Sequence, residues 1–394
     1  MKSKIYSLAL IGVILICFTA FNYGCSDVNG DGVSVNGMKA LSAAQEADID
    51  AFVTQKMAEH KIPGVIVAVY EADKIPYILV KGTAEVAANR PLEATDRFRI
   101  GSITKTFTAT VILQLAGERK LNLDESVLKY FPDLPNASKI TVHHLLNMTS
   151  GLANYTDDNN IGMTLLSNPA KKFTQEEIYS LIKSLSSKAV LSEPGAVASY
   201  NNSNYFLLGM IIEKVTGSKA GDEIKRRICD RLGMNDTYMS DSDKIDGAHS
   251  MGYIADGTLT VEFMSNPSWC WTAGAMVSTL ADVKKYIKPM ATCELCPKYA
   301  SERLAWRELR SYANPYGAGT VKMSYGLGIA NFGGMAGHNG AILGYSTLAV
   351  YYQPRDITVI ILTNKFMDTP VHSEEILRDR IFGIVLGSGY PVNY

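Results

Sequence analysis

Segments that favour β-strands lie at both ends of this chain, and helical segments fill its middle. Two such segments come early, at residues 64–72 and 75–82, and three come late, at 324–330, 341–352 and 357–364. A sheet must bury its faces, and short segments at opposite ends of the chain achieve this by meeting in one sheet. We therefore predict an α+β fold with an antiparallel sheet built from both chain ends and flanked by helices.

Helical periodicity covers most of the remaining chain. The segments with a helical pattern are 43–60, 105–118, 141–149, 174–185, 203–216, 221–232 and 372–386. The central ones predict a mainly helical lobe, roughly residues 120–250, inserted into a single domain over residues 43–394. We expect the functional site in the cleft between this lobe and the sheet.

The first residues are typical of a bacterial export signal. Lys2 and Lys4 precede an apolar run too short to span a bilayer comfortably, and a Gly-Cys pair at Cys25 closes the run. This pair resembles a lipoprotein cleavage and lipidation site, and ordinary signal cleavage is the alternative. We expect a signal peptide over residues 1–25, a lipid on Cys25 and a flexible Gly- and Asn-rich tether over 26–42. The mature protein is then exported to the periplasm or cell envelope, with the membrane as a partner through the lipid.

Charge and cysteine content narrow the set of partners. The formal net charge is −1 and no long basic run occurs, so we expect no nucleic-acid partner. The body of the chain holds four cysteines, Cys229, Cys270, Cys293 and Cys296. An oxidising compartment permits disulfides among them, with free thiols as the alternative. Only one CxxC occurs, without paired histidines nearby, so we predict no metal site.

The Ser-x-x-Lys pattern occurs three times, at residues 102–105, 126–129 and 180–183. Residues three apart share a face of a helix, so each pattern can place a hydroxyl beside an amine. The second and third lie in amphipathic segments with several charged neighbours, where a solvated helix surface is expected. The first follows a short extended run that ends in glycine, and it opens a helix that is apolar on nearly all faces. We therefore predict Ser102 as the nucleophile.

A helix start suits Ser102 to nucleophilic chemistry. Its backbone N–H is one of the unpaired donors of the first turn and can hold an oxyanion. Lys105 lies one turn deeper, where burial and the helix dipole lower the pKa of an amine toward that of a general base. The alternative role for Ser102 is a helix N-cap.

The second candidate element is Tyr200-x-Asn202, on a turn before an apolar helix. A phenol there can point into the cleft and, with Lys105, relay a proton between nucleophile and leaving group. The amide of Asn202 can hold a substrate carbonyl. Packing is the alternative role for Tyr200. A competing Tyr-x-Asn at Tyr312 precedes a proline and lacks a following helix, so we predict a loop there.

The third candidate element is His338-x-Gly340, directly before an apolar strand that starts at Ala341. Glycine and imidazole at a strand edge allow a substrate backbone to lie against it. We expect His338 and Gly340 to bind substrate, with a protonated His338 holding a terminal carboxylate, and the N–H of Ala341 to be a second oxyanion donor. The alternative is a neutral imidazole that only donates a hydrogen bond or shapes the strand edge.

The three elements together resemble the penicillin-recognising serine hydrolases: class C β-lactamases, the D-alanyl-D-alanine carboxypeptidases related to them, and esterases of the same fold. The resemblance runs from about Asp48 to Gly387. The segments that carry it are RFRIGSITKTFTATVILQLAGERKLNLDESVLKYFPDL, ITVHHLLNMTSGLANYT, PGAVASYNNSNYFLLGMIIEKVTG and WTAGAMVSTLADV. A His-x-Gly in place of Lys-Thr-Gly departs from class C β-lactamases and is most similar to the secreted carboxypeptidase branch and some esterases.

This resemblance implies a β-lactamase/transpeptidase-like fold and an acyl-enzyme mechanism without metal or organic cofactor. Ser102 attacks a carbonyl after losing its proton to the Lys105–Tyr200 pair, and the N–H groups of Ser102 and Ala341 stabilise the oxyanion. The leading function is a D-alanyl-D-alanine carboxypeptidase or a related D-amino-acid peptidase that acts on cell-wall peptides. The alternatives are an esterase or weak β-lactamase with the same chemistry, and a penicillin- or peptide-binding sensor without turnover.

Overall fold

The computed structural model describes residues 37–188, 191–256, 259–313, 320–367 and 372–391. A compact unit begins at Met38 and holds the helices and strands described below. The expected signal peptide, the lipidation site at Cys25 and most of the tether lie outside the described residues.

The segment 38–42 was predicted as tether, and it belongs to the compact unit instead. The N–H of Ala40 donates to the carbonyl oxygen of Ile75 at 2.9 Å. Ser42 then caps helix α1 (Ala43–His60) through a reciprocal capping box. The Gly- and Asn-rich residues that precede this segment caused the tether to be predicted too long.

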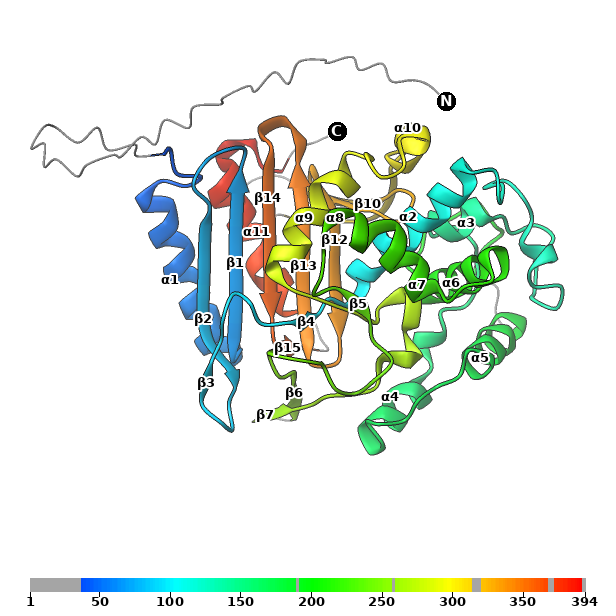
Figure 1. The fold of residues 1–394 in the computed structure, drawn as a ribbon, viewed down its shortest axis with the longest axis horizontal. Coiled ribbons are helices and arrows are strands. Elements are labelled where there is room, and N and C mark those ends of the chain that lie inside the picture. The colour runs from blue at the N-terminus through cyan, green and yellow to red at the C-terminus, as the bar shows by residue number, and fades with distance from the viewer. Residues whose placement is uncertain (1–36, 189–190, 257–258, 314–319, 368–371, 392–394) are drawn as a thin grey trace, which may run out of the picture. The chain divides into compact units, whose positions relative to one another are not determined.

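A nine-stranded sheet joins the two ends of the chain, as predicted (Figure 1). In spatial order its strands are β3 (Arg90–Pro91), β2 (Tyr77–Glu85), β1 (Gly64–Glu71), β14 (Ile357–Thr363), β13 (Tyr345–Tyr352), β12 (Met335–Ile342), β11 (Ala330–Phe332), β10 (Thr320–Tyr325) and β9 (Arg307–Ala313). β1 pairs antiparallel with β14, from Val65 opposite Thr363 to Glu71 opposite Ile357. The predicted antiparallel sheet of an α+β fold is therefore confirmed.

The late strands divide at turns that the prediction missed. The predicted strand 341–352 is the end of β12 and the whole of β13, joined by a hairpin turn at Leu343-Gly344. Gly344 has a φ of +94°, which glycine adopts without strain. The predicted strand 324–330 likewise bends between β10 and β11. β13 is buried on both faces, so its sequence is a nearly continuous apolar run that conceals the turn before it.

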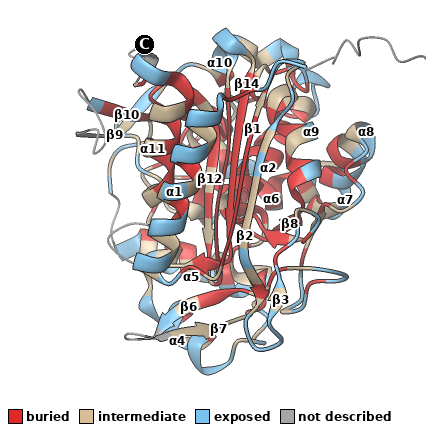
Figure 2. Cartoon of the chain, turned by 90° about the vertical axis from the view of Figure 1, so that its left-hand side faces the viewer, coloured by how far each residue is buried: buried red, intermediate tan, exposed pale blue. Residues whose placement is uncertain are grey.

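Helices cover both faces of the sheet (Figure 2). α1 and α11 (Ser373–Leu386) pack together on one face, where the side chain of Gln45 donates to the carbonyl oxygen of Ile384 at 2.7 Å. α9 (Leu280–Ala291) and α2 (Thr104–Gly117) cover the other face. Every residue of β14 is buried between these layers, which places the core of the fold along the centre of the sheet.

The predicted helical lobe lies beside the sheet (Figure 1). Its elements are α3 (Val142–Leu146), α4 (Asn159–Ser167), α5 (Gln175–Lys188), α6 (Asn202–Thr216), α7 (Ala220–Ile224), a π-helical turn (Lys225–Cys229) and α8 (Asp230–Leu232). α2 contacts both α6 of the lobe and β12 of the sheet, and nearly all of its residues are buried. Among the described helices, none combines the length and apolar character needed to cross a bilayer.

Two small three-stranded sheets and a short helix complete the described fold. These elements are β4 (Phe98–Arg99), β8 (Met276–Ser278) and β5 (Tyr238–Met239) in one sheet, β15 (Lys365–Phe366), β6 (Tyr253–Asp256) and β7 (Leu259–Glu262) in the other, and helix α10 (Ala300–Arg303). β4 is the extended run that was predicted before Ser102, and its pairing with β8 fixes where α2 begins.

Candidate active site

Ser102 lies on a short 3-10 turn, Gly101–Ile103, that leads directly into α2. The preceding strand β4 is paired with β8, and the N–H of Ile100 donates to the carbonyl oxygen of Met276 at 3.0 Å. The chain then turns at Gly101, whose φ is +51°. This local structure presents Ser102 at the N-terminal end of α2, as the sequence predicted.

Two glycines allow this turn to lie directly against β12. A Cβ on Gly340 would lie 2.0 Å from the carbonyl oxygen of Ile100, and a Cβ on Gly101 would lie 2.7 Å from the nitrogen of Ala341. Only glycine is tolerated at such separations. The N–H of Ala341 is thereby brought beside the turn that carries Ser102, as an oxyanion hole shared by both residues requires.

The hydroxyl of Ser102 is available for chemistry. Ser102 lies inside the 3-10 turn, whose N-cap is Ile100, and the N-cap of α2 is Ile103, so the N-cap alternative does not hold. The amine of Lys105 donates to the hydroxyl oxygen of Ser102 at 2.9 Å and to the carbonyl oxygen of Ala273 at 2.7 Å. The structure therefore brings the predicted nucleophile and base into direct contact.

Burial sets the basicity of Lys105. Its side chain is fully buried, and both of its hydrogen-bond partners are uncharged oxygens. Loss of hydration penalises the ammonium form and lowers the pKa of Lys105 to about 7. A large fraction of this amine is therefore unprotonated near neutral pH, as a general base requires.

Tyr200 completes the proton path. Its phenol hydrogen-bonds to Ser102, and its ring centroid lies 4.9 Å from the amine of Lys105. Burial raises the pKa of Tyr200 well above its ordinary value, so the phenol is protonated at neutral pH. Tyr200 is therefore suited to donate a proton, while Lys105 is suited to accept one.

His338 is placed differently from the prediction. It is fully buried, its Nδ1–H donates to the carbonyl oxygen of Asn339, and its Nε2 lies 3.0 Å from the hydroxyl of Tyr325. Burial and the nearby charge of Lys105 lower the pKa of His338 to about 3. The imidazole is thus neutral and both of its nitrogens are engaged. This geometry and the lowered pKa favour the neutral alternative over the expected role as a charged carboxylate ligand.

For Asn202 and Gly340 the structure shows packing contacts, and their expected roles as substrate ligands stay predictions. Neither residue lines the pocket that contains Ser102. The amide nitrogen of Asn202 donates to the hydroxyl of Thr156 at 2.9 Å, which ties α6 to the neighbouring turn. Gly340 instead provides the close packing between β12 and Ile100 described above.

The pocket beside Ser102 has a volume of about 340 Å³. Its lining residues are Ser102, Ala198, Ser199, Tyr200, Leu309, Met323, Asn339, Ala341, His372 and Glu375. Side chains alternate along a strand, so Asn339 and Ala341 lie on the opposite side of β12 from His338 and Gly340. Asn339 is therefore a lining residue that the sequence analysis did not name, while the ring centroid of His338 lies 6.0 Å from that of Tyr200. His372 and Glu375 come from the start of α11, and no local motif identified them.

The competing motifs have structural roles. Ser126 caps the short turn that follows it, and Lys129 pairs with Glu125 at 2.6 Å. Lys183 pairs with Asp133 across the protein surface. Both patterns therefore lie on solvated surface, as predicted. The backbone of Tyr312 lies in β9 rather than in a loop, so that prediction was wrong.

Comparison with known proteins places this geometry in a family. A family model described as Beta-lactamase matches residues 49–382. The chain belongs to the beta-lactamase family. Penicillin-binding protein 4* of Bacillus subtilis is 27% identical over 351 residues, which cover 85% of this chain and 74% of that protein.

Solved structures of the same fold include two amidases. A D-stereospecific amidohydrolase from Streptomyces sp. is 28% identical, with a TM-score of 0.68 over 80% of this chain and 94% of that one. The D-amino acid amidase from Ochrobactrum anthropi SV3, complexed with L-phenylalanine, is 24% identical, with a TM-score of 0.74 over 87% of this chain and 99% of that one. At this identity the second similarity supports the fold alone.

Membership of the beta-lactamase family makes this protein a serine hydrolase with the β-lactamase/transpeptidase-like fold. The resemblance seen in the sequence is therefore confirmed. The contacts of Ser102, Lys105, Tyr200 and Ala341 described above are compatible with the roles predicted for them, which stay predictions.

The first prediction concerns the nucleophile. Ser102→Ala should abolish labelling by a fluorescent penicillin and reduce turnover by about 10⁴-fold or more, because the attacking oxygen is lost. Ser126→Ala is the matched control, since it alters a Ser-x-x-Lys serine whose hydroxyl bonds only to backbone groups, donating to the carbonyl oxygen of Ala137 and accepting from the N–H of Leu128. Persistent labelling of the Ser102 variant would contradict the assignment.

The second prediction concerns the base. Because Lys105 accepts a proton only when it is unprotonated, kcat/KM for a neutral ester should rise with pH and level off above a pKa of about 7. Lys105→Arg is charged throughout this range and should reduce the rate by about 10²-fold or more. A wild-type profile without an acidic limb between about pH 5 and pH 8 would argue against Lys105 as the base.

The third prediction concerns His338. With a pKa lowered to about 3, its imidazole is neutral in the whole range where the enzyme is assayed. The pH profiles of a substrate with a terminal carboxylate and of a neutral ester should therefore run parallel above about pH 5. A fall specific to the carboxylate substrate near the ordinary histidine pKa of about 6.5 would restore the charged role.

Proposed function

We propose that this protein is an acyl-enzyme hydrolase of D-amino-acid peptides, either a D-alanyl-D-alanine carboxypeptidase or a related D-amino-acid peptidase that acts on cell-wall peptides. The observation that carries the proposal is the contact of Ser102 with both the buried amine of Lys105 and the phenol of Tyr200. The similarity to a D-stereospecific amidohydrolase and to a penicillin-binding protein supports a D-configured amide or peptide as the substrate.

In the acylation step, neutral Lys105 takes the proton of Ser102 while the serine oxygen attacks the substrate carbonyl. The N–H groups of Ser102 and Ala341 stabilise the oxyanion that forms. Tyr200 donates its proton to the departing amine and regains one from Lys105. Water then cleaves the acyl-enzyme and restores the free serine.

The charges of the pocket distinguish between substrates with a terminal carboxylate and substrates with a free amino group. Its titratable lining residues, besides Tyr200, are His372 and Glu375, and no Lys or Arg is among the described residues that line it. Arg378 lies 3.7 Å from Glu375 and offsets part of its charge from behind. A terminal carboxylate would meet no fixed cation here, whereas an α-ammonium group would be attracted to Glu375. This arrangement favours a D-amino-acid peptidase whose substrates carry a free amino group.

An esterase is a second candidate because an apolar pocket adjoins the site. This pocket has a volume of about 650 Å³ and is lined by apolar side chains that include Ile161, Leu165 and Phe366. Ala341 lines both pockets, so an apolar group bound there would lie next to the proposed oxyanion hole. Such a pocket suits the acyl chain of an apolar ester.

The cellular location is also a proposal. The basic and apolar start of the chain and the Gly-Cys pair at Cys25 support export and lipid anchoring. Peptides that contain D-amino acids belong to the cell wall, so an exported enzyme would meet its substrate there.

The fourth prediction tests these alternatives with matched substrates. The values of kcat/KM are measured side by side for four substrates: D-alanine amide, its N-acetyl derivative, an acyl-D-Ala-D-Ala peptide and a short-chain ester. We expect the kcat/KM of the free-amino D-substrate to exceed that of its N-acetyl derivative by about threefold, the scale of a solvent-accessible ion pair. Glu375→Gln should remove this preference and leave ester hydrolysis unchanged.

Three results would redirect the proposal. Hydrolysis of the ester without turnover of either D-alanine amide or of the peptide would establish the esterase. A rapid rate confined to the acyl-D-Ala-D-Ala peptide would establish the carboxypeptidase. A penicillin adduct that never regenerates free enzyme, together with no turnover of any substrate, would indicate a sensor.

A further inference from the structure

A second group of reactive side chains lies just after the end of α9. Cys293 and Cys296 are both buried, and the N–H of Cys296 donates to the carbonyl oxygen of Cys293 at 3.0 Å, which closes a tight turn. The thiol of Cys293 lies against the sulfur of Cys296 and donates to the carbonyl oxygen of Ala300 at 4.0 Å. Both cysteines are free thiols in this structure.

Arg303 is the charged neighbour of this pair and is completely buried. Its Nη1 donates to the sulfur of Cys296 at 3.2 Å and to the hydroxyl of Thr110 at 3.1 Å, and its Nη2 donates to the carbonyl oxygen of Thr106 at 3.4 Å. Within the described ranges, no carboxylate forms an ion pair with Arg303. A buried guanidinium without a counter-charge is strongly destabilising. A thiolate at Cys296 supplies that counter-charge.

The two thiols therefore differ in their protonation. The contact with Cys293 and the positive charge of Arg303 hold the pKa of Cys296 below that of a free thiol. The same contact and burial raise the pKa of Cys293. One thiolate next to one protonated thiol provides a nucleophile and a resolving thiol for disulfide exchange.

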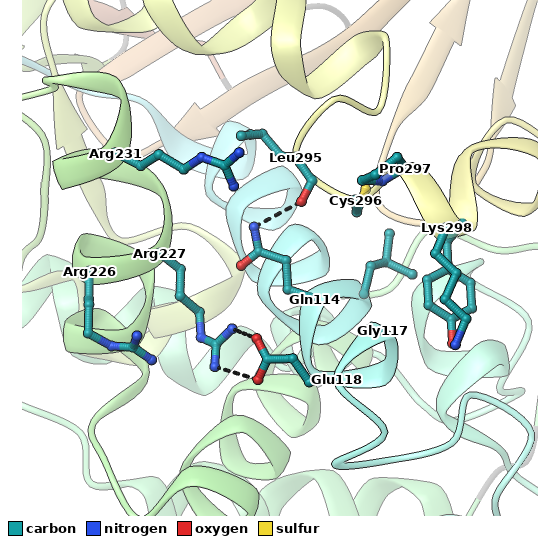
Figure 3. A pocket seen from close by; sticks show the side chains of 12 residues that line it. Gln114, Gly117, Glu118, Arg226, Arg227, Arg231, Leu295, Cys296, Pro297 and Lys298 are labelled. Atoms are coloured by element: carbon teal, nitrogen blue, oxygen red, sulfur yellow. Dashed lines mark hydrogen bonds and ion pairs between the residues drawn. The ribbon is translucent and has the colours of Figure 1, made fainter.

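A basic pocket of about 450 Å³ opens beside Cys296 (Figure 3). Arg226 and Arg231 face it from the π-helical turn and from α8, and Lys298 faces it from the segment after Cys296. The carboxylate of Glu118 is bound by Arg227, and no carboxylate is bonded to Arg231 or Lys298 among the described residues. The pocket therefore carries net positive charge and suits an anionic reagent.

We propose that Cys296 and Cys293 form a thiol–disulfide exchange site, separate from the hydrolase centre, that reacts with anionic low-molecular-weight disulfides bound in the basic pocket. The thiolate of Cys296 attacks one sulfur of the disulfide, forms a mixed disulfide and releases one thiolate. Cys293 then attacks the sulfur of Cys296, transfers its proton to the released thiolate, and expels the second half of the reagent as a thiolate. The cysteine pair is oxidised and the reagent is reduced by the same two electrons.

The test uses the reduced full chain with oxidised glutathione as an anionic probe and cystamine as a cationic probe, followed by intact-mass measurement. Wild type should lose two hydrogens and retain no glutathione. Cys293→Ser should stop with glutathione on Cys296, and Cys296→Ser should leave Cys293 unmodified. Oxidised glutathione should react at least about tenfold faster than cystamine at low salt, and Arg231→Gln with Lys298→Gln should reduce this ratio.

Cys229→Ser is the matched control, because burial raises the pKa of Cys229 to about 12 and its removal should change none of these results. Circular dichroism of each variant checks that the fold is kept. Reduced cysteines after prolonged exposure of folded wild type would overturn the exchange site. Oxidation of Cys293 in the Cys296→Ser variant would also overturn it, as would a faster reaction with cystamine.

Discussion

The amine of Lys105 is held out of water between two uncharged oxygens, and the rest of the active site depends on this arrangement. Neither hydrogen-bond partner is an anion that could replace the lost hydration of the ammonium form. The pKa of Lys105 is therefore lowered by the exclusion of water. The same amine opposes a second cation nearby and so contributes to the neutrality of His338. The protonation states of Lys105 and His338 are therefore linked, and Lys105 is the group of the two that can act as a base toward Ser102 near neutral pH.

Structural features that produce a sequence pattern over many residues could be predicted from the sequence. The helix predicted over 43–60 has the observed bounds of α1, because an amphipathic helix repeats its pattern at every turn. Ser102 could be separated from two other serines because α2 is buried almost all round, and its sequence is accordingly apolar throughout. The meeting of both chain ends in one sheet followed from the need to bury β1 and β14.

Features that depend on a single residue or on tertiary packing could not be predicted from the sequence. The turn at Leu343-Gly344 is short and lies between apolar neighbours, so the hairpin appeared as one strand. The choice between His338 and Asn339 depends on which face of β12 meets the pocket, and a strand pattern fixes alternation but not its phase. Glu375 reaches the pocket only because α11 packs across the sheet, which no local motif encodes.

The near-complete burial of α2 has a consequence for how this protein can be diversified. One side of the helix holds Lys105 against Ser102, and Thr106 and Thr110 hold Arg303. A helix enclosed in this way has little free surface on which substitutions can accumulate without disturbing a neighbour. Engineering of a new substrate preference should therefore leave α2 unchanged and randomise positions such as Asn339, Leu309 and Glu375, which line the pocket from elements that the base does not depend on.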